Sequence, residues 1–204
     1  MSFIKTCFFI LTFLILPIKE NFLLPVNFND RKNISLIRLT EIGEFSLYRK
    51  ARKTVPGHLH TGIDIKRPVK NYNNEPIFSI AEGKVISIRT DGAYAQIIIE
   101  HQFENYQIWS LYEHIAGIKV KVNEVVGTKK TIARFMNKAE LDKFGWQFDH
   151  FHLEILKLKP SALKPSKSQP ERYYNSFSLI CFNKEDLYKY YYDPMEFLSQ
   201  RLYK

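Results

Sequence analysis

The sequence predicts a mainly β protein, an antiparallel β-sandwich or barrel-like fold that ends in short C-terminal helices. The first observation is a series of short segments rich in Ile, Val and Tyr at regular spacing between residues 77 and 157. The second is the turn residues between them, such as Glu82-Gly83 and Asp91-Gly92. The third is size, because 204 residues with 45% hydrophobic content can bury one substantial core. We therefore expect one domain with extensions.

The N-terminal residues 1–20 are predicted to form a signal peptide or an N-terminal membrane anchor. Lys5 supplies positive charge, and residues 6–18 form an uncharged apolar run that is shorter than the roughly 20 residues a spanning helix needs. We expect an exported protein of the periplasm or cell envelope, and the sequence leaves cleavage or retention of this segment open. Residues 21–40 are an entry segment with one expected strand at 35–39.

The main domain is expected over residues 41–158. Asn137 and Glu140 have capping-box spacing, which predicts a short helix ending near Gly145. The strands of the domain are predicted at residues 77–80, 84–88, 94–100, 106–112, 118–122, 131–135 and 150–157.

Residues 159–204 are predicted to be a basic loop followed by a helical extension that packs on the domain. The loop at 160–170 is rich in Pro, Ser and Lys. Asn183 is expected to cap a helix over 184–190, and Asp193-Pro194 to begin another over 195–203. A tyrosine cluster is expected to pack against the sheet: Tyr188, Tyr190, Tyr191 and Tyr192.

The net charge of +9 is compatible with anionic surroundings or with an ordinary lysine-rich surface. The basic run from Arg49 to Lys53 is predicted to be a solvated loop. Nucleic acid is disfavoured as a partner, because basic and aromatic runs do not interleave along the strands. Cys7 and Cys181 are the only cysteines, which excludes a cysteine-type zinc site. Any metal must be held by His and carboxylate.

Two histidines on the predicted strand at 150–157 are the centre of the candidate site. His150 and His152 share one face of that strand, roughly 6.6 Å apart, which is too far for both to bind one ion comfortably from a flat strand. The spacing favours one imidazole on a metal and the other beside a substrate. The intervening side chains are expected in the core: Phe151, Leu153 and Ile155.

His60 and Asp64 form an H-x-x-x-D pattern around Gly62. On a straight strand their side chains would be about 13 Å apart, so they can share an ion only if the backbone bends, and Gly62 would permit this. With one imidazole from His150 or His152, the result is a site with two histidines, one carboxylate and an open position. That is the catalytic form of zinc coordination, although ligand type leaves iron and manganese open.

Tyr112 and His114 stand two residues apart at the end of the predicted strand 106–112. In an extended strand such positions share a face, so we expect both side chains on the same side of the sheet. By itself this spacing is a weak signal for function.

The motifs H-x-x-x-D, Y-x-H and H-x-H-x-E, in this order, resemble the lysostaphin/LytM-type zinc metallopeptidases, which cut peptide cross-links in bacterial peptidoglycan. The resemblance covers roughly residues 40–157 and a terminal element, and it implies the duplicated hybrid motif fold. It also implies a zinc-dependent endopeptidase, D,D-endopeptidase-like, that attacks the peptide bond with a metal-activated water. Similar flanking segments are residues 60–65 (HTGIDI), 81–85 (AEGKV) and 193–198 (DPMEFL).

The resemblance also implies a role for each residue of the motifs. One Zn²⁺ per chain would be held by His60, Asp64 and His152. The catalytic pair would be His114 and His150, with Tyr112 near the developing oxyanion. Independently of the resemblance, Glu154 lies on the same strand face as the histidines, so we expect it either to orient a ligating imidazole or to have a structural part. His58 and His101 receive no role.

The segment at 143–149 (KFGWQFD) and Phe151 differ from the family pattern, which has a Gly- and Ser-rich turn there and Leu between the two histidines. The bulkier border favours a D-Ala cross-link over a glycine bridge as substrate. The alternative function is a catalytically inactive wall-binding module of the same fold that regulates another murein hydrolase. Since all five predicted metal and catalytic His and Asp residues are present, the sequence favours the enzyme. We expect a monomer that acts on peptidoglycan peptides and binds no nucleic acid.

Overall fold

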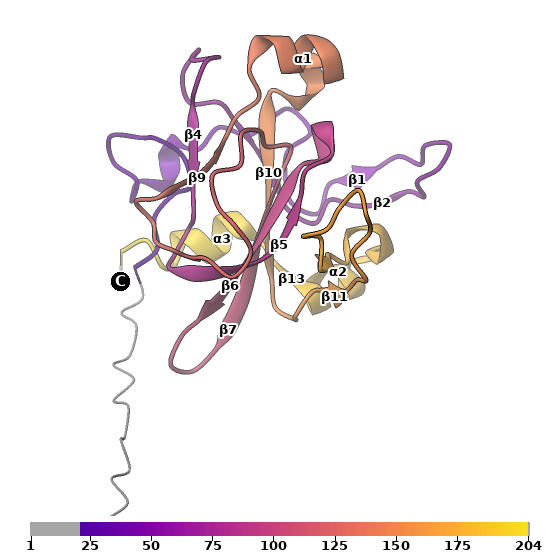
Figure 1. Cartoon of the computed structure of the whole chain (residues 1–204). Helices are drawn as coiled ribbons and strands as arrows, with labels where there is room; N and C mark the ends of the chain where they lie inside the picture. Colours follow the sequence, from indigo (N-terminus) through magenta and orange to yellow (C-terminus); the bar gives the residue numbers. More distant parts are fainter. Residues whose placement is uncertain (1–20, 204) are drawn as a thin grey trace, which may run out of the picture.

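The computed structural model describes residues 21–203, and the predicted signal peptide or anchor at 1–20 lies outside the described residues. A central antiparallel sheet, in the order β13-β10-β7-β6-β5-β8 with β3 also pairing with β10, organises the fold (Figure 1). The predicted mainly β, antiparallel architecture with short helices is confirmed. The strands of this sheet are β3 (Ile63–Lys66), β5 (Gly83–Arg89), β6 (Gln96–Gln102), β7 (Gln107–Glu113), β8 (Val125–Val126), β10 (His150–Leu156) and β13 (Tyr191–Tyr192).

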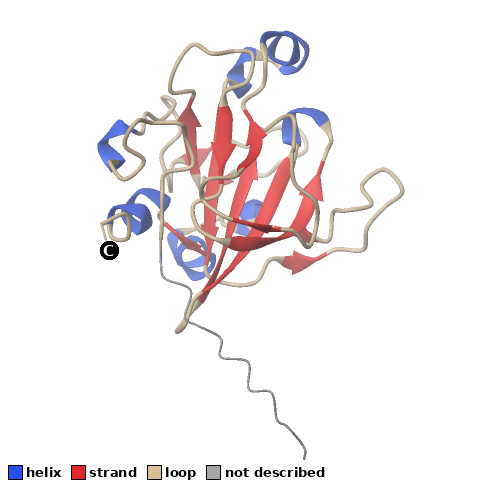
Figure 2. Cartoon of the chain, turned by 60° about the vertical axis from the view of Figure 1, so that its left-hand side comes forward, coloured by secondary structure: helices blue, strands red, loops and turns tan. Residues whose placement is uncertain are grey.

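Three small two-stranded sheets and several short helices surround the central sheet (Figure 2). The pairs are β1 (Tyr48–Arg49) with β2 (His58–Leu59), β4 (Pro76–Phe78) with β9 (Thr131–Arg134), and β11 (Ser161–Ala162) with β12 (Tyr174–Asn175). The α-helices are α1 (Lys138–Phe144), α2 (Lys184–Tyr190) and α3 (Pro194–Ser199). The 3₁₀ turns are η1 (Ile34–Leu36), η2 (Gly92–Tyr94), η3 (Trp146–Phe148) and η4 (Ser178–Ile180). None of the helices in the part of the chain that the structure describes is long and apolar enough to cross a bilayer.

Side chains of β10 alternate between two hydrophobic cores. Phe151, Leu153 and Ile155 enter the main core, as expected for period-2 alternation. On the opposite face, Leu156 packs under the C-terminal segment with Leu187 of α2. His150 therefore lies on the same face as this second core, toward the other end of the strand. The imidazoles of His150 and His152 therefore lie beyond the part of this face that the second core covers.

The predicted helices form because their capping signals are local. The Asn137 side chain accepts from the N–H of Glu140, whose carboxylate accepts from the N–H of Asn137, and α1 ends before Gly145 as predicted. Asn183 caps α2, and Asp193 caps α3. The last helix is shorter than predicted and ends at Ser199.

The prediction of a strand at 35–39 is wrong. The Asn33 side chain accepts from the Ser35 N–H at 3.1 Å and begins the 3₁₀ turn η1 there. Only Leu39 makes a β-bridge, with Ile65. Local capping by Asn outweighed the apolar Leu and Ile content of this stretch.

The prediction of a strand at 118–122 is also wrong. Gly117 and Asn123 both have positive φ, 53° and 71°, so the chain turns at each end of this stretch. Val120 is buried in the main core without belonging to a strand, and β8 forms three residues after the end of the predicted strand. The apolar residues of this stretch therefore indicate burial in the main core and not pairing in a sheet.

Candidate active site

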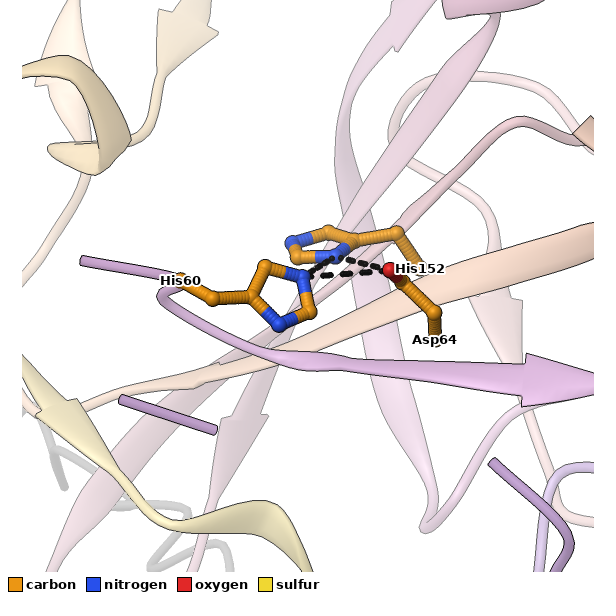
Figure 3. Close-up of side chains that lie close together, drawn as sticks. All are labelled: His60, Asp64 and His152. Carbon is orange, nitrogen blue, oxygen red and sulfur yellow. Dashed lines mark hydrogen bonds and ion pairs between the residues drawn. The ribbon is translucent and has the colours of Figure 1, made fainter. Parts of the chain in front are cut away.

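Three side chains converge at the junction of β3 and β10. His60 Nε2, Asp64 Oδ1 and His152 Nδ1 are separated by 3.0 Å, 3.0 Å and 3.1 Å, and the residues are 6%, 5% and 8% exposed (Figure 3). The antiparallel register pairs His152 with Asp64 across the two strands. His60 comes from the loop that enters β3, so residues 92 positions apart meet at one point.

Gly62 allows this convergence by close approach as well as by the backbone bend. A Cβ at this position would lie 2.2 Å from the Leu153 carbonyl oxygen and 2.8 Å from Cε1 of His152. Since real Cβ atoms do not come this close to backbone, no larger residue fits while Leu153 and His152 stay in place. The expected bend is present, between His60 and the start of β3.

The second nitrogen of each imidazole is committed to a protein acceptor. His60 Nδ1 donates to the Glu44 carbonyl at 2.8 Å, and His152 Nε2 donates to Glu154 Oε1 at 3.2 Å. Thr61 holds the same Glu154 oxygen with a hydrogen bond of 2.5 Å. These contacts orient both rings so that His60 Nε2 and His152 Nδ1 point into the cluster.

The cluster has the donor chemistry and the size for a zinc ion. Tetrahedral zinc with bonds of about 2.1 Å separates its ligand atoms by about 3.4 Å, which is within a few tenths of an ångström of the spacings seen here. Two imidazoles and a carboxylate, without thiolate, suit zinc and other divalent metals. Among residues 21–203, these three form the one group of His, Cys, Asp or Glu side chains close enough to share an ion.

The electrostatics of the cluster keep Asp64 charged. Burial by itself would raise the pKa of its carboxyl, but hydrogen bonds from His152 and His60 hold that pKa well below its usual range. Burial opposes the charged form of His152, yet its contacts with Asp64 and Glu154 raise its pKa to about 10. A metal ion would compete with a proton at this ring, so metal binding should weaken as the pH falls.

His150 and His114 lie beside the cluster and not within it. His150 Nε2 is 3.6 Å from Asp64 Oδ1, and burial lowers the pKa of His150 to about 4. The His114 ring meets that of His150 edge-on, with centroids 5.2 Å apart, and its Nδ1 donates to the Ala93 carbonyl at 2.6 Å. Burial also lowers the pKa of His114, against the opposing effect of Glu113. Both rings are therefore neutral near pH 7.

Tyr112 is not brought to the cluster. It is fully buried in the main core, where its ring stacks near Phe151 and its hydroxyl accepts from the Ile80 N–H at 2.9 Å. The expectation that Tyr112 and His114 share a face is wrong, because His114 follows the end of β7 with φ of 62°. This left-handed residue breaks the alternation and turns the imidazole toward His150.

Sequence reasoning missed Arg49 and Glu113. Arg49 Nη2 lies 2.7 Å from Asp64 Oδ2, although the basic run that contains it was predicted to be a solvated loop. Glu113 is the cross-strand partner of His152, and its carboxylate comes within 3.9 Å of His114 Nε2. The only sequence signal for Glu113 is its position next to His114, and Arg49 has none, because its contact depends on the β1–β2 hairpin.

This chain matches one protein-family model and several solved structures. The model of peptidase family M23 matches residues 58–165. The structure of lysostaphin, an antimicrobial peptidase from Staphylococcus simulans, has a TM-score of 0.50 at 19% identity over 83% of this chain and 53% of that one. The structure of a zinc-containing peptidase from Vibrio cholerae has a TM-score of 0.45 at 25% identity, over 67% of this chain and 37% of that one. The structure of LytU has a TM-score of 0.43 at 22% identity, over 61% of this chain and 77% of that one. A search among curated proteins finds no match. This chain thus spans about a third of the Vibrio structure and about half of lysostaphin.

Proposed function

This chain belongs to peptidase family M23, and on that premise we propose that it is a zinc-dependent endopeptidase that hydrolyses peptide cross-links in bacterial peptidoglycan. The observation that carries the proposal is the convergence of His60, Asp64 and His152, with two further neutral imidazoles alongside. A purely structural metal site would be closed by a fourth protein ligand. This cluster offers three protein ligands, which leaves a coordination position open.

His60, Asp64 and His152 would hold the ion. When bound, zinc would supply a Lewis acid that polarises a substrate carbonyl and acidifies a water molecule. His150 would accept and return a proton, a role supported by its neutral ring and by Asp64, which lies 3.6 Å away and would stabilise the imidazolium. His114 keeps its Nδ1–H on the Ala93 carbonyl, which leaves Nε2 as a proton acceptor.

We also propose a D,D-endopeptidase-like specificity for D-Ala cross-links and an exported protein of the periplasm or cell envelope that acts as a monomer. The bulky border from Phe144 to Phe148 supports a substrate other than a glycine bridge. The apolar run at residues 6–18 supports export, and the net charge of +9 suits an anionic wall.

Digestion of purified peptidoglycan sacculi tests the function. Zinc-loaded wild type should release new amino groups, and His150→Ala should lower the rate about 10²–10⁴-fold, as loss of a general acid or base does. His58→Gln, which changes a histidine outside the site, is the control and should retain wild-type activity. If zinc-loaded wild type releases no amino groups, the inactive wall-binding module becomes the better account.

A further inference from the structure

A groove of about 660 Å³ extends from the cluster along the outer end of β3. Asp64 and His150 line one end of it, so the groove is continuous with the proposed reaction site. Its lining also includes two lysines and two aromatic side chains: Lys66, Lys70, Tyr72 and Trp146. The groove therefore has the position and size to take the part of a substrate next to the bond that is cut.

Lys66 has a fixed place in this groove. It is the cross-strand partner of His150, and it lies two residues beyond Asp64 on the same face of β3, about 6.6 Å along the strand. Ile65 between them is fully buried, which confirms that Lys66 projects outward. An extended peptide advances about 3.3 Å per residue, so the Lys66 ammonium lies within reach of the first two substrate residues beyond the scissile amide.

The groove's two lysines, unlike its arginine, carry positive charge that is not paired within the described part of the protein. The Arg67 guanidinium already makes hydrogen bonds within the protein, since it donates to Asp149, to the Met136 carbonyl and to the Asn71 carbonyl. Asp64 and Asp149, the groove's buried or half-buried carboxylates, are paired with arginines. Among the described residues, Lys66 and Lys70 form no ion pair, and Glu41 is the one unpaired carboxylate that lines the groove. The described groove lining thus carries two unpaired lysines and one unpaired carboxylate.

The groove lining also has an aromatic part, formed by Tyr72 and Trp146. Trp146 is 49% exposed, yet its ring meets Tyr72 edge-on at 5.8 Å and its Nε1 donates to Asp142 at 2.9 Å. A large apolar side chain held half-exposed beside a catalytic cluster offers a surface for a substrate's aliphatic atoms. A groove that combines unpaired lysines with a half-exposed aromatic ring suits an acidic residue with an alkyl stem.

We propose that Lys66 and Lys70 bind a free carboxylate carried by a substrate residue within two positions of the scissile amide. The protein then selects cross-linked peptides that keep this carboxylate over neutral ones, oligoglycine included. This inference rests on the proposed peptidase function and names the chemical feature that its substrate must carry.

The test uses two synthetic peptides that differ in one group. One carries the free carboxylate next to the scissile amide, and the other carries a carboxamide there. For wild type, kcat/KM for the acid should exceed that for the amide about tenfold, as expected for one charge-assisted pair. Lys66→Gln and Lys70→Gln should each reduce this ratio toward one, while Lys129→Gln, an exposed lysine outside the groove, should leave it unchanged. Raising the salt concentration should also reduce the ratio for wild type.

The two proposals fail in different ways. Equal cleavage of both peptides by wild type, or a ratio that neither groove substitution lowers, overturns the carboxylate site while leaving the peptidase intact. If neither peptide is cleaved, the peptidase function fails, and the same peptides are then titrated against wild type with tryptophan fluorescence as the readout. In that case equal affinity for acid and amide overturns the carboxylate site, and tighter binding of the acid that Lys66→Gln abolishes supports it.

Discussion

Arg49 Nη2 lies 2.7 Å from Oδ2 of Asp64, while Oδ1 of the same carboxylate faces the ring nitrogens of His60 and His152. The arginine comes from the β1–β2 hairpin and is 18% exposed at its side chain. It therefore occupies one carboxylate oxygen and leaves the other for the metal. Arg49 thus favours an orientation of Asp64 in which only Oδ1 would bind the metal.

Arg49→Ala should weaken zinc binding about tenfold, because Asp64 loses the partner that fixes its orientation. Competition with a chromophoric chelator measures the affinity. Arg52→Ala, in the same basic run but without a contact to the cluster, is the matched control and should bind zinc as wild type does. Equal affinity in Arg49→Ala and Arg52→Ala would show that Asp64 needs no such support.

Gly62→Ala should destabilise the fold by about 1–3 kcal/mol, as overpacking does, because the new Cβ would collide with the Leu153 carbonyl and the His152 ring. Urea unfolding measures the change. Gly127→Ala is the control, since a Cβ there meets nothing within 4 Å, and it should be neutral or slightly stabilising. Indistinguishable midpoints for the two variants would refute the close-approach account of Gly62.

His101 should make folding stability depend on pH. It is fully buried between the Glu82 carbonyl and Ser110, and burial lowers its pKa to about 4. Because the unfolded chain takes up this proton near pH 6.5 and the folded chain does not, stability is complete above pH 6.5. It falls by up to about 3 kcal/mol as the pH drops toward 4. Urea unfolding from pH 7.5 to 4.5 should show a shallower loss for His101→Gln than for wild type, and parallel curves would contradict the assignment.

Sequence signals between residues close together in the chain gave most of the correct predictions of helices and strands. The Asn137 capping box, the Asn183 and Asp193 caps and the alternation along β10 each depend on neighbours within four residues, and each gives the expected element. The H-x-x-x-D and H-x-H motifs pointed to side chains that the structure brings together, although their catalytic and metal-binding roles stay predictions.

The errors share a different cause. The orientation of His114 depends on one left-handed residue, which alternation along a strand does not encode. Asn33 converted a β-like stretch into a 3₁₀ turn by a single side-chain cap. The Arg49 contact requires a hairpin that places residue 49 beside β3, and a basic run in the sequence holds no information on that distance.

Zinc content per chain is the most direct test of the central claim that His60, Asp64 and His152 hold a catalytic metal. After chelation and reconstitution, elemental analysis should find about one zinc per chain in wild type and in His150→Ala, because His150 lies beside the cluster and not in it. His152→Ala should retain none. Equal zinc in His152→Ala and wild type, or no zinc in wild type, would contradict the account.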